Sequence, residues 1–172
     1  VYRYGPSGFP TETWMGSNYW VDVAFVPSSA PPTGNCPCTI WPASAVPTVT
    51  SANDSAAVEV GVKFRTSEAG FISGIRFYKG ALNSGVHIGN LWSATGTLLA
   101  SATFTSESAQ GWQQVTFGTP VPVTANTTYV ASYHAPNGGY AGDNSYFSGA
   151  GVTNGPLNAL GDGVDGGDGV YR

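Results

Sequence analysis

The sequence predicts an all-β protein, folded as a sandwich of Greek-key or jelly-roll type. Apolar and polar residues alternate with a period of two along several segments, as in strands that bury one face. Turn residues separate these segments at short intervals. No window of helical length has apolar residues at a spacing near 3.6. We therefore expect strands at residues 19–26, 58–65, 71–79, 87–93, 97–105, 112–117, 121–124 and 128–134.

The segment at residues 58–65 shows the alternation most clearly. Its apolar side is Val58, Val60, Val62 and Phe64, and its polar side, which we expect to be exposed, is Glu59, Lys63 and Arg65. A turn with glycine, residues 94–96, joins the fourth and fifth segments as a hairpin. Pro120 and Pro122 cannot donate to a ladder, so we expect residues 112–117 and 121–124 to form two separate strands.

Composition indicates one extracellular domain. The 172 residues are enough for a sizeable core. Only 9% of them are charged, against roughly 25% in ordinary soluble domains. The net charge is −4 and the basic residues are scattered, so nucleic acid is not an expected partner. No apolar stretch approaches the roughly 20 residues of a membrane span, and no leader pattern is visible, so we expect no membrane insertion.

The N-terminal segment is set apart from the rest of the chain. The tripeptide VYR at residues 1–3 recurs at residues 170–172, as in a tandem array. We divide the chain into a strand segment at 1–26, a Pro/Ser-rich linker with a C-x-C motif at 27–38, and a sandwich body at 39–172 with a Gly/Asp-rich end. Twenty-six residues cannot bury a core. The segment must therefore complete a sheet in its own chain or in a neighbouring copy.

Several sequence motifs in the body resemble those of a known bacterial extracellular family. They are TIWPASAVPTV, AVEVGVKFR, GFISGIRFYKG, VHIGNLWSATGTLLASATF, GWQQVTF, TTYVASYHAPNGGYA and NGPLNAL. In this order they are similar to domain of unknown function 4082, over about three quarters of the chain. The resemblance implies a module of secreted or cell-surface proteins that serves adhesion, assembly or glycan contact, with no catalytic residues to carry over. In that family the stretch similar to residues 1–25 closes the domain at its C-terminal end.

The N-terminal position of this strand leads to our main functional expectation. A body without its strand at residues 19–26 would expose an unpaired apolar sheet edge. Donation of that strand to the next copy would build a head-to-tail fibre. The alternatives are a strand that folds back on its own chain and a fragment of a tandem repeat. The residues expected to enter the partner are Tyr19, Trp20, Val21, Val23 and Phe25.

The two cysteines, Cys36 and Cys38, suit a small disulfide in an oxidising compartment. Free thiols and a metal shared with other chains are the alternatives. The loop GDGVDGGDG places Asp162, Asp165 and Asp168 three residues apart among glycines, which suits the oxygen ligands of Ca²⁺. The alternative is a solvated acidic turn. Calcium is the one cofactor that the sequence suggests.

Aromatic residues in the loops are the candidates for ligand binding. Tyr140, Tyr146 and Tyr171 lie in Gly/Asn-rich stretches, where rings can stack on sugars. Neither His87 nor His134 has a nucleophile motif nearby, and no carboxylate pair suggests glycosidase chemistry, so we do not expect an enzyme. The expected function is a structural module of an extracellular bacterial assembly, with copies of itself as partners. The alternative is a carbohydrate-binding module that binds polysaccharide, with or without calcium.

Overall fold

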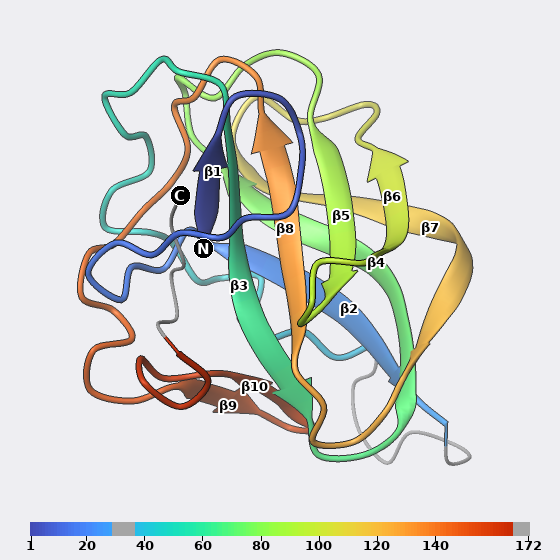
Figure 1. The fold of residues 1–172 in the computed structure, drawn as a ribbon. Helices are drawn as coiled ribbons and strands as arrows, with labels where there is room; N and C mark the ends of the chain where they lie inside the picture. The colour runs from blue at the N-terminus through green and yellow to red at the C-terminus, as the bar shows by residue number, and fades with distance from the viewer. Residues whose placement is uncertain (29–36, 167–172) are drawn as a thin grey trace.

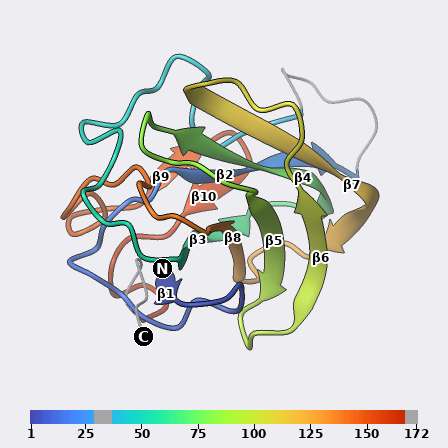
Figure 2. The same cartoon turned by 90° about the horizontal axis from the view of Figure 1, so that it is seen from above.

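The computed structural model describes residues 1–28 and 37–166, and these form two antiparallel sheets packed as a sandwich (Figures 1 and 2). The predicted all-β sandwich is confirmed. The larger sheet has the order β6-β5-β8-β3-β10-β9 with β1 beside β3, and the smaller has the order β2-β4-β7. The strands are β1 (Tyr2–Tyr4), β2 (Val21–Pro27), β3 (Val58–Thr66), β4 (Gly70–Lys79), β5 (Ile88–Ser93), β6 (Leu98–Thr103), β7 (Gly111–Val123), β8 (Tyr129–Ala135), β9 (Val152–Asn154) and β10 (Leu157–Ala159).

The chain passes repeatedly from one sheet to the other. It crosses between β3 and β4, β4 and β5, β6 and β7, and β7 and β8, as Figure 2 shows from above. One edge of β3 is shared by two short strands. Tyr2–Tyr4 pairs with its first half and Leu157–Ala159 with its second half. Alternation in β3 and β4 then directs one apolar face of each sheet into the common core.

Aromatic rings pack at the centre of the core. Phe77 of β4 stacks on Tyr133 of β8 with ring centroids 4.1 Å apart, and the edge of Phe104 meets Phe77 at 4.8 Å. Val60, Val62 and Phe64 reach the same cluster from β3 and are buried. The expected apolar side of that strand is therefore the core side.

The N-terminal strand pairs within its own chain. β2 lies antiparallel to β4, with Val21 opposite Phe77 and Val23 opposite Ile75. The expectation that this strand is donated to a neighbouring copy is therefore wrong for this structure. The residues expected to enter a partner are buried in their own sandwich: Tyr19, Trp20, Val21, Val23 and Phe25. The linker is long enough for the strand to fold back, and closure within the chain buries the same apolar side chains without a second copy.

A buried ion pair lies on the face of β2 that points away from the core. Asp22 accepts backbone hydrogen bonds from Val23, Ile40 and Trp41 at 2.7 to 3.3 Å. Nη1 of Arg76 lies 2.9 Å from Oδ2 of Asp22. The Asp22 carboxylate thus connects Ile40 and Trp41, which follow the linker, to β2 and, through Arg76, to β4. Burial without these partners would cost several kcal/mol, about 3–5 when one charge of such a pair is removed.

The outer face of the larger sheet is covered by the N-terminal segment. Val1 and Phe9 pack against Trp92 and Val130 as a second apolar cluster. Under this cover Glu59 is 0% exposed, so the expectation of an exposed side chain is wrong. Alternation along β3 correctly directs Glu59 away from the core. The segment that covers it lies fifty or more residues earlier in the chain.

Two further expectations change. Pro120 and Pro122 do not break the sheet, because β7 is an edge strand and continues through both of them. The short strands β1, β9 and β10 were not expected. Cys38 is disulfide-bonded, as predicted, and Cys36 lies outside the described residues. No helix within residues 1–28 and 37–166 has the length and hydropathy of a membrane span.

Candidate functional site

A pocket lined by aromatic rings lies where the N-terminal segment meets the loop after β8. Its volume is about 370 Å³, within the range of roughly 300–1,000 Å³ that is common for ligand sites. Trp14 and Tyr4 at its rim are 51% and 43% exposed, whereas Tyr2 and Tyr19 are buried behind them. The aromatic residues that line this aromatic pocket are Tyr2, Tyr4, Trp14, Tyr19 and Tyr140.

The tyrosine rings hold one another in fixed orientations. Tyr2 meets Tyr4 edge to face with centroids 5.5 Å apart, and Tyr19 at 5.7 Å. Tyr19 in turn meets Tyr140 edge to face at 5.7 Å. Edge-to-face pairs of this kind contribute about 0.5–1.5 kcal/mol beyond their burial. The rings thus hold fixed orientations relative to one another before any ligand arrives.

Two hydroxyl groups at the pocket donate to one carboxylate. The hydroxyls of Tyr4 and Tyr140 lie 2.6 Å and 3.3 Å from Oδ2 of Asp54. Oδ1 of Asp54 accepts from the backbone N–H of Ala56, which forms an Asx-turn. Burial, together with the neighbouring charge of Asp54, raises the pKa of Tyr4 and of Tyr140 above the ordinary value. Both phenols are therefore neutral donors.

Strained backbone positions frame the aromatic pocket. Met15 and Ser145 have φ angles of +48° and +58°, in the left-handed region that non-glycine residues rarely adopt. The N–H of Ser145 donates to the carbonyl of Met15 at 3.0 Å. Asn18 and Asp143 form a two-way backbone bridge beside them. Such strain costs of order 1–3 kcal/mol per residue and tends to occur at binding sites.

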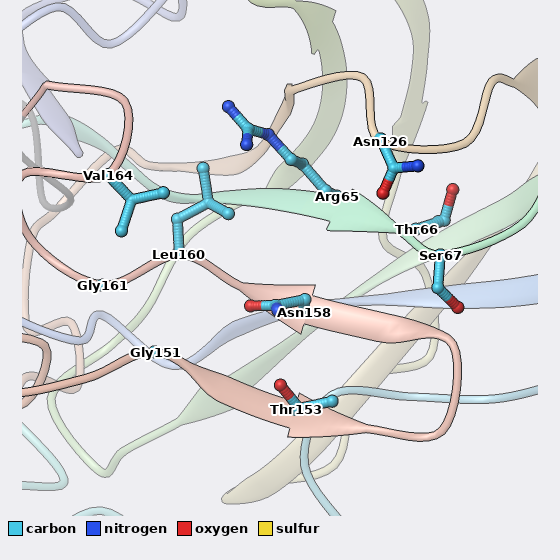
Figure 3. A pocket seen from close by; sticks show the side chains of 10 residues that line it. All are labelled: Arg65, Thr66, Ser67, Asn126, Gly151, Thr153, Asn158, Leu160, Gly161 and Val164. Atoms are coloured by element: carbon cyan, nitrogen blue, oxygen red, sulfur yellow. The ribbon is translucent and has the colours of Figure 1, made fainter.

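A second, polar pocket of about 330 Å³ lies at the opposite end of β3 (Figure 3). Asn158 and Thr153 line it from β10 and β9, and Leu160 and Val164 form its apolar end. Arg65 lies on its far side. This guanidinium already forms an ion pair with Asp165 at 3.1 Å, so the strongest charge of the polar pocket is compensated within the chain.

The expected calcium loop is partly described. Oδ2 of Asp165 accepts from Thr128 and Arg65, and these contacts lower the pKa of Asp165. Nζ of Lys63 donates to the backbone carbonyl of Asp165 at 2.7 Å. Asp162 is bonded through its backbone N–H to Phe147, and Asp168 lies outside the described residues. Within residues 1–28 and 37–166, no three His, Cys, Asp or Glu side chains gather as metal ligands. The calcium site stays a prediction.

The buried histidine His87 is fixed in a network. Its Nδ1 lies 2.8 Å from Glu107 and its Nε2 lies 2.7 Å from Oδ1 of Asn83. Lys79 pairs with Glu107 at 2.7 Å, and Asn83 donates to Tyr133. Burial lowers the pKa of His87, although Glu107 opposes the shift. Because both ring nitrogens are engaged inside the protein, this imidazole is not available to a substrate.

Of the three loop tyrosines expected to bind a ligand, one lies at the aromatic pocket. Tyr140 lines the aromatic pocket, as anticipated for a loop tyrosine. Tyr146 lies elsewhere, packed against Trp20 and Phe147. Tyr171 lies outside the described residues. The sequence did not single out Trp14 or the tyrosines of residues 2–19 as ligands. Their density in a short segment was the available signal.

A comparison of the sequence with family models matches residues 44–172 to Domain of unknown function (DUF4082). The match spans most of the chain, and the chain therefore belongs to this family. No curated protein matches it. The aromatic pocket combines matched residues, Tyr140 among them, with rings from the segment before residue 44.

Proposed function

We propose that this member of the DUF4082 family is a non-catalytic, extracellular carbohydrate-binding module. The observation that supports it best is the aromatic pocket, in which the exposed Trp14 stands beside rings already fixed in place. Sugar rings offer apolar C–H faces, and aromatic rings that are already fixed in orientation bind them at a smaller ordering cost. The hydroxyl groups of Tyr4 and Tyr140 and the amide of Asn144 supply polar contacts at the same place.

Location outside the cell is part of the same proposal. Charged residues are scarce and Cys38 is disulfide-bonded. Disulfides persist in oxidising compartments. Bacterial cell walls and matrix polysaccharides would then be the accessible ligands for the aromatic pocket.

A panel of soluble polysaccharides tests the proposal. Retardation in polysaccharide-containing native gels, followed by calorimetric titration with oligosaccharides, measures the affinity. We expect Trp14→Ala to weaken binding at least tenfold, about 1.4 kcal/mol, with an unchanged melting temperature. Phe71→Ala is the matched control, because Phe71 is a comparably exposed aromatic residue on β4, away from the aromatic pocket. Equal losses in both variants, or binding by neither parent nor variants, contradict the proposal.

A second candidate is a structural subunit of a surface assembly. β6 ends the larger sheet, contains no charged residue, and exposes Leu98 and Leu99. Unprotected edges of this kind pair readily with other chains. Copies would then join edge to edge through β6, without donation of β2. Sedimentation over a wide concentration range tests this, with Ser101→Lys on β6 expected to reduce any self-association. A monomer at every concentration refutes it.

A further inference from the structure

We propose that the sugar bound in the aromatic pocket carries a protonated amine, so that the ligand is an amino-sugar polysaccharide with free amino groups. This inference rests on the proposed carbohydrate-binding function and narrows it to one chemical class. It follows from the charges around the pocket and from the orientation of its rings.

The charge at the aromatic pocket is negative. Among the residues that line it, all in the described part of the chain, none is Lys, Arg or His. Arg3 lies between Tyr2 and Tyr4 in sequence, but its guanidinium packs against Gly8. The Asp54 carboxylate is bonded to the hydroxyls of Tyr4 and Tyr140, two of the lining residues. A cation in the pocket would meet no positive side chain among the lining residues. An anion would be repelled by the Asp54 carboxylate.

The rings are arranged to receive a cation. The faces of aromatic rings carry negative electrostatic potential, and several faces around one space form the aromatic cages that bind ammonium groups. Tyr2 stands at 77° to Tyr4 and at 79° to Tyr19, so the rings are not coplanar, and Tyr4 and Trp14 are the rings exposed to a ligand. Hydrogen bonds from two phenols to a carboxylate add electron density to those rings. Both features favour a positively charged ligand over a neutral one.

Asp54 is held in place independently of the ligand. Its Oδ1 accepts from Ala56, and its backbone carbonyl accepts from Gly139 at 2.7 Å. Its Oδ2 is the oxygen that meets both phenols. Asparagine at this position retains the Oδ1 contact and removes the charge. The substitution thus separates the electrostatic contribution from the fold of the turn.

Calorimetric titration with three oligosaccharides of equal length tests the inference: a glucosamine oligomer, its N-acetylated counterpart and a neutral glucose oligomer. We expect the parent protein at mildly acidic pH to bind the glucosamine oligomer at least tenfold more tightly than the other two. Asp54→Asn should reduce this preference to less than threefold. Glu68→Gln, which removes one charge at the turn between β3 and β4, should keep it.

Three results would overturn the inference in distinguishable ways. Equal affinity of the parent protein for all three oligomers removes the amine from recognition and leaves the carbohydrate-binding function standing. Binding of none removes both. If choline chloride binds and none of the three oligomers does, the aromatic pocket is instead a site for a quaternary ammonium group. Should Asp54→Asn not fold, the parent protein decides, because its preference must disappear when the pH is raised above the pKa of the sugar amine.

Discussion

Replacement of Glu59 by glutamine should stabilise this protein at neutral and alkaline pH. Glu59 is wholly buried under the N-terminal segment, with Oε1 accepting from Asn90 at 2.8 Å and from Ser132 at 2.5 Å. Oε2 lies 3.7 Å from Nδ1 of His134, and neither atom has a hydrogen-bond partner among the described residues. Glutamine keeps the two existing contacts, and its amide can donate to the imidazole.

The magnitude follows from the titration of this carboxyl group. Burial raises the pKa of Glu59 to about 7 from its ordinary value of 4.5, although hydrogen bonds from Ser132 and Asn90 oppose the shift. The folded state therefore holds its proton more tightly than the unfolded state. Between pH 4.5 and about pH 7 the unfolded state loses the proton first, and folding stability falls as pH rises. The loss at pH 8 is about 3 kcal/mol, at roughly 1.4 kcal/mol per pKa unit.

Urea unfolding of Glu59→Gln and of the parent at several pH values between 4 and 8 measures this difference. The two proteins should have similar free energies of unfolding near pH 4, and the variant should be more stable by about 3 kcal/mol at pH 8. Burial lowers the pKa of His87 and of His134, and His134 is coupled to Glu59 because its Nδ1 lies 3.7 Å from Oε2. Glu68→Gln, at the more exposed turn between β3 and β4, serves as the control. A constant difference across the pH range, or a variant less stable at pH 8, refutes the reasoning.

Three other perturbations have defined outcomes. Deletion of residues 1–26 should give insoluble or molten protein, because it removes β1 and β2; near-ultraviolet circular dichroism and melting show this, and a monomer with an unchanged melting temperature contradicts it. Arg76→Met should cost about 3–5 kcal/mol in urea unfolding by leaving Asp22 buried and unpaired, and Asp22→Asn in the same chain should recover part of the loss. Calcium at a hundred times its dissociation constant should stabilise the parent by about 2.7 kcal/mol and have no effect once the three loop aspartates are asparagine. No melting shift in the parent disposes of that site.

Most of the fold could be predicted because local patterns report one buried face. The alternation in β3 and β4 places Val60 and Ile72 in the core without any knowledge of their partners. The strands β9 and β10 have only three residues each, too few to show a period. Burial of Glu59 could not be predicted, because its cover comes from a distant segment.

The candidate site was predictable only in part for a related reason. Tyr140 stands in a Gly-rich loop and was expected to meet a ligand. Tyr2 and Tyr4 reach the same place because β1 pairs with β3, and Trp14 because residues 14–18 bond to residues 143–145. Which of several pairings a three-residue strand adopts is decided by the whole sandwich. Sequence patterns alone therefore indicated aromatic ligand residues without assembling the pocket.

The N-terminal segment contributes β1 to the larger sheet and β2 to the smaller one, and this affects how the chain folds during translation. β2 leaves the ribosome before its partner β4, which ends at Lys79. The other partner of β4 is β7, which ends only at Val123. β3 likewise waits for β8, which ends at Ala135. Apart from the hairpins β5–β6 and β9–β10, the strand pairs join distant parts of the chain, which slows folding. A nascent chain in which Ala135 has not yet been added therefore carries unpaired apolar strands, and the sandwich closes as one late event.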